Sequence, residues 1–592
     1  MRYPYGLSDF HRISAERRFY IDRTDRIRLI EESGDQLLLL RPRRFGKSLW
    51  LSTLENYYDL AKADEFEKLF GHLKIGQDPT PLHNRYFVMN WNFSLVDPQG
   101  DVDAIRAVLF RHINVRIRAV VAKYRTLLGE EEVLIREEDA VASFQSLLSA
   151  ISLTPYRLYL LVDEYDNFAN EVMVSHQQGT NRYQELVGGE GVIKTMFKAV
   201  KDGAEGRGLE RVFMTGVSPV VLADITSGYN VVENVSLYPE YADLCGFHEE
   251  EIRLTLERIV AECDQPPAKA EEALELMRTF YNGYRFCPRP ECGQIYNPTL
   301  AIYFFQHLAK ECRYPEEMLD SNLAMDRNRI KYVARLPHGQ KLVTDALNPA
   351  NPIAISRLEN RFGVEMMLST PQDHGFLASL LYYFGVLTYC GRDAMGKLLL
   401  KVPNLVVRRL YVERIREALL PGYEVNEQRL AVTDRFYTAG ELAPLCDFIE
   451  QRFFTVFDNR DGRWSNELVV KTAFLTTLFN DTAYLMDSET AIDKGYADLT
   501  LIIRPDMRHY AFLDHLLEFK HLGLQRLGLT NEQVRAKSRE ELTALPLVQT
   551  ELKAAQAQLA RYRETLERVY GEKLRLRTHA VIGLGLTRLV WA

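Results

Sequence analysis

An apolar run from Gln36 to Leu40 leads directly into Arg41-Pro-Arg-Arg-Phe-Gly-Lys-Ser48. The run predicts a buried strand, and the residues from Leu49 onward are compatible with a helix. In a strand, a loop ending in Gly-Lys-Ser and a helix, backbone N–H groups and the helix dipole can hold phosphate groups. This feature therefore predicts an α/β domain with a phosphate-binding loop (a P-loop).

The predicted ligand of the loop is ATP with Mg²⁺. Lys47 would reach the β- and γ-phosphates, and the Ser48 hydroxyl would bind Mg²⁺. The other residues assigned to the nucleotide are Arg44, Phe45, Gly46 and Leu49. The usual motif begins with Gly where this chain has Arg41, so the loop is less free to adopt a positive φ there. A basic loop before a helix, without a ligand, is the alternative interpretation.

A second strand-like run, residues 158–162, ends in Asp163 and Glu164. An acid at the end of such a strand can enter the Mg²⁺ shell, and a neighbouring Glu can polarise the attacking water. We therefore assign Asp163 to the metal and Glu164 to catalysis. A further strand at 211–215 places Thr215 or Ser218 where either could contact the γ-phosphate. A turn stabilised by hydroxyl hydrogen bonds is an equally good interpretation of those two residues.

The chain divides into three regions that differ in their predicted secondary structure. Residues 1–255 alternate short apolar runs, at 36–40, 86–90, 158–162 and 211–215, with helical stretches, which predicts a parallel sheet covered on both faces. Residues 256–450 are predicted to be mainly helical. Residues 451–592 predict the order α-β-β-β-α-β, from a helix at 466–479, strands near 483–489, 497–503 and 511–520, a helix at 549–570 and a strand at 577–583.

The last region holds a second candidate site. Asp498 opens one predicted strand, and Glu518 and Lys520 lie two apart on the next, so they share a face. Two carboxylates and a lysine can hold Mg²⁺ and activate a water. Glu467 would be a further metal ligand, and Mn²⁺ is an alternative ion. A solvated charged strand is the competing interpretation, but the adjacent apolar residues favour a central strand, where unexplained charge is costly.

Composition limits the partners and the location. The chain has 592 residues, which suggests roughly three or four domains, and a net charge of −8. It is therefore not a basic protein that coats nucleic acid, although a local basic groove would suffice to bind it. The N-terminus lacks a signal-peptide core, and no window approaches the ~20 apolar residues of a membrane span. These features predict a cytoplasmic protein without a membrane partner.

The seven cysteines are odd in number and scattered, as is typical of a reducing compartment. Cys287 and Cys292 lie close together, but a zinc site would need two more ligands. Buried or loop thiols are therefore favoured over zinc.

The motifs together resemble an AAA-ATPase-like family whose members carry a C-terminal PD-(D/E)XK nuclease-like domain. The N-terminal resemblance rests on Arg41-Pro-Arg-Arg-Phe-Gly-Lys-Ser48, a form usual in that family, and on Phe19-Tyr-Ile-Asp-Arg-Thr24, Val162-Asp-Glu-Tyr-Asp166 and Thr215-Gly-Val-Ser218. The middle region matches at Tyr281-Asn-Gly-Tyr-Arg-Phe286, Tyr296-Asn-Pro298, Leu380-Leu-Tyr-Tyr-Phe-Gly-Val-Leu-Thr388 and Val402-Pro-Asn404. The C-terminal match is looser and rests on Glu467, Gly495 to Asp498, Glu518 to Lys520, Gln558 and Tyr562.

The resemblance implies a P-loop ATPase domain fused to a restriction-endonuclease-like α/β domain. One departure is Tyr496-Ala497 before Asp498, where family members often carry Arg and a large residue; this affects substrate contact and leaves the acid in place. Gln558 and Tyr562 either face the site or belong to the surface and core. Roles in defence or mobile-element biology follow only by association with the family.

Three functions remain open at this point. The first is an ATP-regulated, Mg²⁺-dependent nuclease acting on nucleic acid, with DNA favoured over RNA. The second is a nucleotide-controlled switch whose C-terminal domain only binds nucleic acid or a protein. The third is a remodelling ATPase, for which a homo-oligomer would have to supply an arginine in trans. The local basic candidates are residues 327–331, Arg408 and Arg409, and Lys573, Arg575 and Arg577, each of them more typical of a solvated face.

Overall fold

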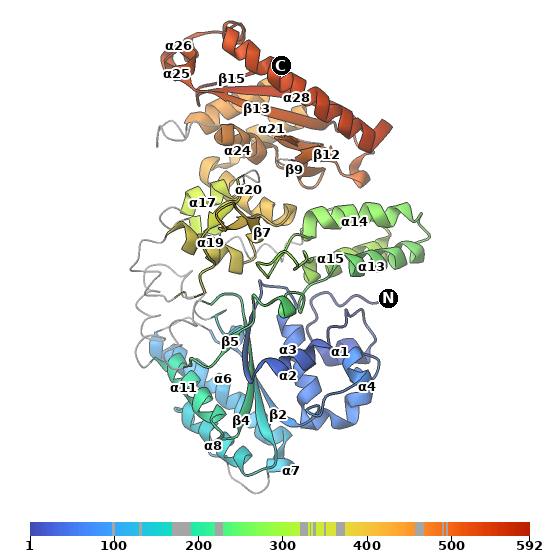
Figure 1. Cartoon of the computed structure of the whole chain (residues 1–592), viewed down its shortest axis with the longest axis vertical. Helices are drawn as coiled ribbons and strands as arrows, with labels where there is room; N and C mark the ends of the chain where they lie inside the picture. Colours follow the sequence, from blue (N-terminus) through green and yellow to red (C-terminus); the bar gives the residue numbers. More distant parts are fainter. Residues whose placement is uncertain are drawn as a thin grey trace.

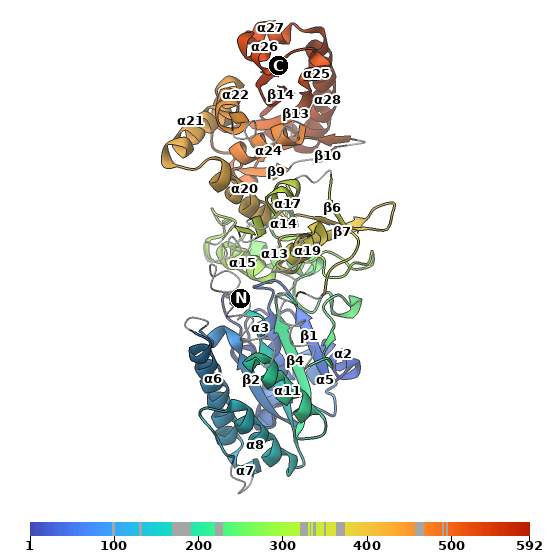
Figure 2. The same ribbon diagram turned by 90° about the vertical axis from the view of Figure 1, so that its left-hand side faces the viewer.

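A computed structural model describes the chain except for residues 98–100, 129–132, 168–190, 220–228, 320–329, 332, 335–338, 348–350, 361, 363–372, 456–466, 488–489 and 493–494. The molecule is elongated, and three tiers follow one another along its long axis in chain order (Figure 1). The N-terminus lies near the junction of the first two tiers, and the C-terminus lies in the third. The quarter-turn view in Figure 2 shows the same stacking.

The first tier is built on a five-stranded sheet. Its strand order is β2-β3-β4-β1-β5, and all its pairs are parallel. The strands are β1 (Gln36–Leu40), β2 (Tyr86–Asn92), β3 (Arg157–Asp163), β4 (Leu209–Gly216) and β5 (Glu233–Asn234). The four strands predicted from their apolar runs are confirmed. The two-residue strand β5 has no such run, and only its pairing with β1 makes it a strand.

Helices cover both faces of this sheet, as the parallel arrangement requires. Figure 1 shows α1 to α4 on one side and α6, α8 and α11 on the other. The first group comprises α1 (Phe10–Ala15), α2 (Arg26–Ser33), α3 (Lys47–Tyr58), η1 (Leu60–Glu65), α4 (Phe66–Phe70) and α5 (Lys74–Gln77). The remaining elements of this tier are η2 (Phe93–Leu95), α6 (Val102–Lys123), α7 (Arg125–Leu128), α8 (Ala140–Ser152), α11 (Val192–Ala204) and η3 (Pro239–Tyr241).

The middle tier is mainly helical, as predicted. Of the predicted middle region, α21 (Tyr423–Ala439) and α22 (Leu442–Ile449) lie beside the third-tier sheet instead, and the π-helical turn η5 (Glu450–Phe454) continues α22 (Figure 2). The helices of the middle tier are α13 (Glu249–Glu262), α14 (Ala268–Tyr281), α15 (Pro298–Glu311), α17 (Gly339–Asp345), α19 (His374–Tyr383) and α20 (Leu405–Leu419). The middle tier also contains a small antiparallel sheet that the sequence analysis did not predict. Its strands, in the order β6-β8-β7, are β6 (Ile353–Ile355), β8 (Leu398–Lys401) and β7 (Thr388–Arg392).

The third tier contains the predicted α-β-β-β-α-β order with additional strands. The helix is α24 (Glu467–Leu478), and the sheet order is β15-β14-β13-β12-β9. The strands are β9 (Tyr484–Asp487), β12 (Leu499–Ile503), β13 (Asp514–Leu522), β14 (Leu576–Leu584) and β15 (Arg588–Trp591), with a separate hairpin of β10 (Thr490–Ile492) and β11 (Gly495–Ala497). The other helices are η6 (Pro505–Met507), α25 (Leu524–Leu527), α26 (Asn531–Ala536), α27 (Arg539–Thr543), α28 (Pro546–Tyr570) and η7 (Gly571–Lys573).

The long helix α28 connects β13 to β14, which pair in parallel. Helices α20, α21 and α22 all contact α24. One cluster of buried apolar side chains extends through all three tiers, from Tyr3 to Leu589. A second cluster lies between α28 and the third-tier sheet.

Four of the seven cysteines form disulfides, so the prediction of free thiols is wrong at these positions. Cys263 pairs with Cys312, and Cys287 pairs with Cys292. The first bond joins the C-terminal ends of α13 and α15, which only packing brings together. The pairing of Cys287 with Cys292 also removes them as zinc ligands. Cys245, Cys390 and Cys446 carry free thiols.

Among the described residues, no helix combines the length and the apolar character needed to cross a membrane.

Candidate functional site

The predicted phosphate-binding loop connects β1 to α3. Gly46 is the N-cap of α3 with φ 89°, and Arg44 has φ 65°, so the left-handed residues of the loop are these two. Arg41 is not among them, which removes the expected difficulty at the position usually occupied by Gly. The α3 N-terminus therefore presents its N–H groups at the end of the loop, where an anion is favoured.

Lys47 lies inside this loop. Its side chain is buried, and Nζ donates hydrogen bonds to the carbonyl oxygens of Arg41 at 2.9 Å and Pro42 at 3.0 Å. Burial lowers the pKa of the Lys47 ammonium, while the nearby carboxylates of Asp163 and Glu164 act in the opposite direction. The ammonium is thus held across the loop by backbone carbonyls.

Three side chains from separate segments meet beside the loop. Ser48 Oγ donates to Asp163 Oδ2 at 2.6 Å, and Thr215 Oγ1 donates to Asp163 Oδ1 at 2.6 Å. The strand order explains the meeting, because β4, which carries Thr215, lies between β1 and β3. The structure thus brings together the predicted residues Ser48, Asp163 and Thr215.

Ser218 has a different environment from Thr215. Asp166 accepts hydrogen bonds from the backbone N–H of Val217 and from both the N–H and the hydroxyl of Ser218. Tyr165 Oη donates to the Ser218 carbonyl at 2.8 Å. This is the strand-end turn that was the alternative interpretation for these hydroxyl residues.

Glu164 follows Asp163 in a left-handed conformation, with φ 52°. Burial raises the pKa of its carboxyl, and the charge of Lys47 counteracts that rise. A non-glycine residue rarely adopts this backbone conformation, and such residues concentrate at functional sites. The conformation separates the directions of the two acids, so that Glu164 lines the adjoining cavity.

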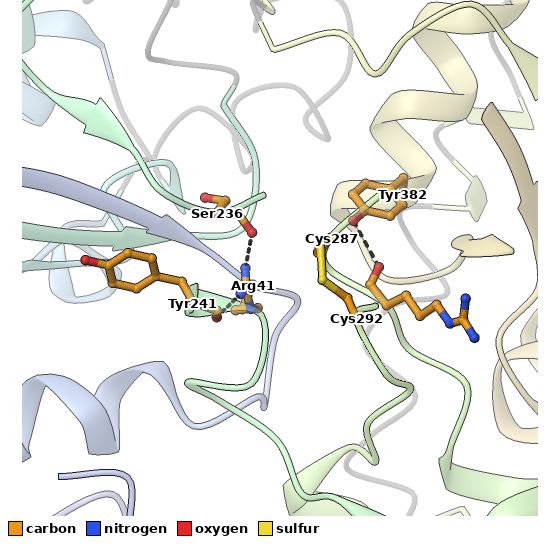
Figure 3. The surroundings of a disulfide bond; sticks show 7 residues. Arg41, Ser236, Tyr241, Cys287, Cys292 and Tyr382 are labelled. Carbon is orange, nitrogen blue, oxygen red and sulfur yellow. Dashed lines mark hydrogen bonds between the residues drawn. A yellow bond between two sulfur atoms is a disulfide. The ribbon is translucent and has the colours of Figure 1, made fainter. Parts of the chain in front are cut away.

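Arg41 is a buried anchor for the loop rather than a phosphate ligand. Its guanidinium donates to the carbonyl oxygens of Leu40 at 2.7 Å, Ser236 at 2.8 Å and Tyr241 at 2.6 Å. It also lies 4.4 Å from the ring centroid of Phe286. Figure 3 shows Arg41 directed at Ser236 and Tyr241, with the Cys287–Cys292 disulfide on the other side.

A cavity of about 700 Å³ opens at the loop. The predicted residues 44–49 and Glu164 form one side, and Pro298, Thr299 and Ile302 of α15 contribute to another. Much of the remaining wall comes from segments that were not assigned to a site, at residues 4–8, 20–21 and 244–247. A cavity of this size and mixed lining suits a nucleotide. The motif beginning at Phe19 gave a signal for residues 20–21; the other two segments gave none.

The middle tier contacts the loop directly. Thr299 Oγ1 donates to the Arg44 carbonyl at 2.7 Å. The Phe45 ring packs edge-on against Tyr284 and Phe286, with centroid distances of 4.8 and 5.0 Å. These contacts give a structural role to the motif at 281–286.

Comparison with known proteins places this site in a recognisable domain. A family model described as a predicted AAA-ATPase matches residues 4–226. These residues form an AAA-ATPase-like domain. A curated relative, the uncharacterized protein in the vnfD 5′ region of Azotobacter chroococcum mcd 1, is 25% identical over 306 residues, covering 51% of this chain and 51% of that protein. The chain therefore spans about half the length of this relative.

Two solved structures have some similarity to the chain. The Walker-type ATPase paby2304 of Pyrococcus abyssi has a TM-score of 0.36 and 14% identity, covering 67% of this chain and 97% of that chain. The Aeropyrum pernix ORC1 protein, solved in complex with DNA, has a TM-score of 0.24 and 13% identity, covering 69% and 93%. These superpositions are loose, and the family model carries the assignment of residues 4–226.

Three of the four residues predicted for the second site, Asp498, Glu518 and Lys520, lie together in the third tier. The β12–β13 register pairs Leu499 with Leu517, so Asp498 adjoins Glu518. Asp498 Oδ2 accepts a hydrogen bond from the Phe519 N–H at 2.7 Å, and Lys520 Nζ lies 2.8 Å from Glu518 Oε1.

Lys471 belongs to the same cluster and was missed. Its Nζ lies 3.0 Å from Asp498 Oδ1. Glu467, one turn earlier at the exposed start of α24, is close enough for its charge to contribute to the raised pKa of Glu518. The sequence did contain a sign of this residue, because Lys471 is the single charged residue in the stretch 468–479. A charge in such an apolar stretch is costly unless it has a partner.

Glu518 is the most buried acid of this cluster. Only 1% of its surface is exposed, and burial and the Asp498 charge raise its pKa to about 7, against the lowering effect of Lys520. Among the described residues its Oε2 has no hydrogen-bond partner. The same described part of the chain contains no group of three or more His, Cys, Asp or Glu side chains arranged to hold a metal. Two carboxylates with one unpartnered oxygen still fit Mg²⁺, which uses few protein ligands and keeps water or phosphate oxygens.

Gln558 and Tyr562 lie on α28. Gln558 Nε2 donates to Tyr562 Oη at 3.1 Å, and Tyr562 packs in the second apolar cluster. That cluster includes Leu516 and Leu522, which lie on the same face of β13 as Glu518 and Lys520. The helix therefore covers the strand face that carries the site, with Tyr562 part of the core beneath it.

Several of the predicted basic residues pair with protein groups. Arg408 lies 3.5 Å from Asp487, and Arg409 lies 3.0 Å from Glu413. Arg575 donates to the carbonyls of Tyr510 and Arg508. Residues 327–329 lie outside the described residues, and Lys331 pairs with Glu417 at 3.0 Å.

Proposed function

We propose that residues 1–255 bind ATP with Mg²⁺ and hydrolyse it. The observation that carries this proposal is the convergence of Ser48 and Thr215 on Asp163, beside the N-terminus of α3. A phosphate group bound at that N-terminus would lie next to a hydroxyl and a carboxylate, the ligands that Mg²⁺ prefers. The matching AAA-ATPase family model supports the proposal.

The residues have distinct roles in this proposal. The Lys47 ammonium moves from its backbone carbonyls to the β- and γ-phosphates. Ser48 and Asp163 would hold Mg²⁺, which when bound there would neutralise charge on the phosphates. Thr215 orients the Asp163 carboxylate. Glu164, whose pKa is raised by burial, accepts a hydrogen bond from the attacking water and orients it.

Measurements of ATP binding and of ATP hydrolysis distinguish these roles. Lys47→Ala should weaken the binding of a fluorescent ATP analogue at least about tenfold, because it removes a phosphate contact. Glu164→Gln should retain binding while phosphate release falls by on the order of a hundredfold. Lys62→Ala serves as control, since Lys62 pairs with Glu65 outside the cavity. Unchanged ATP binding by Lys47→Ala would contradict the proposed site.

The proposal extends to the third tier: residues 451–592 form a PD-(D/E)XK-type nuclease domain acting on nucleic acid, with DNA favoured. Its support is the gathering of Asp498, Glu518 and Lys520 at the meeting of β12 and β13. Asp498 and Glu518, with Glu467 as a further acid, would hold Mg²⁺ or Mn²⁺, which supplies a water of lowered pKa. Lys520 would orient that water and stabilise charge at the phosphate. Residues 256–450 would connect the two ends.

A substrate panel tests this part of the proposal. Plasmid, linear and single-stranded DNA and RNA are incubated with Mg²⁺ or Mn²⁺, with and without ATP. Cleavage should disappear in Glu518→Gln and persist in Glu532→Gln, which alters an exposed residue of α26. Loss in Lys47→Ala as well would show that nucleotide governs cleavage.

One observation favours a second candidate, in which the third tier only binds nucleic acid or a protein and the ATPase acts as a switch or remodeller. Lys471 already neutralises Asp498, and a binding-only domain needs no metal. Absence of cleavage from every substrate, with ATP still bound, would favour this candidate. A rate of ATP hydrolysis per chain that rises with protein concentration, together with an increase in molar mass measured by light scattering, would indicate a homo-oligomer.

A further inference from the structure

Lys471 is a buried cation in the third-tier cluster to which the proposed nuclease chemistry gives no role. Its side chain is 7% exposed, and its ammonium lies 3.0 Å from Asp498 Oδ1. Lys471 belongs to α24 and the two acids belong to the sheet, so the ion pair of Lys471 with Asp498 joins this helix to the sheet. A buried ammonium is stable only with such a partner.

The cluster leaves little room for another cation beside Asp498. Asp498 Oδ2 accepts the Phe519 N–H at 2.7 Å, and Oδ1 contacts the Lys471 ammonium. Glu518 Oε1 contacts Lys520, and among the described residues Glu518 Oε2 is the carboxylate oxygen of this pair without a partner. A divalent ion bridging both acids would therefore lie next to the Lys471 ammonium. Two cations at such a distance in a buried site repel strongly.

We infer that Lys471 is a positioning residue that competes with the divalent ion for Asp498 and is released to a phosphate group of the nucleic acid. The inference rests on the proposed nuclease function and adds a regulation of that site. Metal alone binds weakly, because the ammonium must withdraw without a new partner. A phosphodiester anion supplies that partner, so metal and nucleic acid bind cooperatively.

Metal affinity tests this directly. Mn²⁺ binding is measured by the electron paramagnetic resonance signal of the free ion, without nucleotide, and the Asp498→Asn protein defines the signal from other sites. Lys471→Met, similar in size and uncharged, should bind Mn²⁺ on the order of tenfold more tightly than the unsubstituted chain. Lys471→Arg keeps the charge and should show no such gain.

A nucleic-acid probe tests the cooperativity. A short DNA duplex with phosphorothioate linkages should tighten Mn²⁺ binding to the unsubstituted chain and have a smaller effect on Lys471→Met. Equal Mn²⁺ affinities of the chain and Lys471→Met would overturn the inference and leave the nuclease proposal standing. No Mn²⁺ binding to either protein at this site would overturn both.

A measurement on the unsubstituted chain covers the case in which Lys471→Met does not fold. Lysine acylation followed by mass spectrometry reports how accessible each ammonium is. Mn²⁺ together with the duplex should change the acylation rate of Lys471, because its ion pair with Asp498 is broken, while Lys62 in the first tier keeps its rate. An unchanged rate for Lys471, with Mn²⁺ bound, would overturn the inference.

Discussion

Arg41 stands where the usual phosphate-binding motif has Gly, and its buried side chain fixes the start of the loop. The guanidinium is 1% exposed and donates to carbonyls on β1, after β5 and at Tyr241. Because the planar group carries five donors in a fixed geometry, it can hold three segments at once. The phosphate-binding loop is therefore anchored at its first residue by side-chain hydrogen bonds.

Replacement of Arg41 should destabilise the first tier. Arg41→Met is expected to lower the free energy of unfolding by about 2–4 kcal/mol, because buried carbonyls at Ser236 and Tyr241 lose their donors. Urea denaturation followed by tryptophan fluorescence measures it. Arg43→Met is the control, since Arg43 is half-buried and donates a 3.2 Å hydrogen bond to the Asn167 side chain. A loss no larger than that of the control would mean that the buried guanidinium is not an anchor.

A histidine pair predicts a pH dependence at the residue scale. His515 and His579 lie 3.2 Å apart, nitrogen to nitrogen, beneath Phe436. Burial and the charge of Arg577 lower the pKa of His579 to about 4, and burial and His579 lower that of His515 well below its usual value. The unfolded chain takes up protons near pH 6.5 and the folded chain only near pH 4, so stability should fall as the pH falls through that window.

Removing one member of the pair should weaken this dependence. His579→Phe keeps an aromatic ring against Phe436 and should lose about 1–2 kcal/mol less free energy of unfolding between pH 7 and pH 5 than the unsubstituted chain. Urea titrations at the two pH values measure the difference. His509→Gln, at an exposed position, should behave like the unsubstituted chain. Parallel pH profiles for all three proteins would contradict the burial of a neutral pair.

At the scale of elements, the connection after α19 presses against the phosphate-binding loop. Gly385 has φ 75°, and a Cβ added there would lie 2.5 Å from Pro42 Cγ. The Phe45 ring is packed by Tyr284 and Phe286 on the same side of the loop. The middle tier therefore supports the loop mechanically, and its position should affect nucleotide affinity.

Gly385→Ala and Gly396→Ala form a matched pair that isolates this contact. Gly396 has φ 78° and no atom within 4 Å of an added Cβ, so both variants carry a similar backbone strain. Gly385→Ala should cost about 1–3 kcal/mol more and should weaken ATP binding, as measured with a fluorescent analogue and by thermal unfolding. Equal losses of stability and of ATP affinity in the two variants would show that Pro42 can shift without affecting the loop.

At the scale of the whole molecule, the two disulfides restrain the middle tier very differently. Cys263–Cys312 closes a segment with a sequence separation of 49, and Cys287–Cys292 one of 5. Because a longer closed loop removes more freedom from the unfolded chain, the first bond should contribute about 4 kcal/mol and the second about 2 kcal/mol.

Paired serine substitutions test that ranking. Under oxidising conditions Cys263→Ser with Cys312→Ser should lower the urea midpoint more than Cys287→Ser with Cys292→Ser. A thiol reductant should bring the urea midpoint of the unsubstituted chain close to that of a variant in which all four of these cysteines are serine. Cys390→Ser, which alters a free thiol, is the control. A reductant without effect on the unsubstituted chain would mean that these bonds do not form in solution.

Local patterns in the sequence predicted much of this protein. The apolar runs at β1 to β4 and the Gly-Lys-Ser loop were recognisable because strand burial and phosphate binding depend on neighbouring residues. The spacing of Glu518 and Lys520 likewise predicted their shared face.

Only the tertiary structure decided how these pieces combine. β5, the Cys263–Cys312 disulfide, the carbonyls held by Arg41 and the pairing of Lys471 with Asp498 all join residues that are distant in sequence or belong to different elements. No local pattern encodes such partners, because burial and charge pairing are set by what the folded chain brings alongside. The sequence alone determined which residues could do chemistry, and packing decided which of them meet.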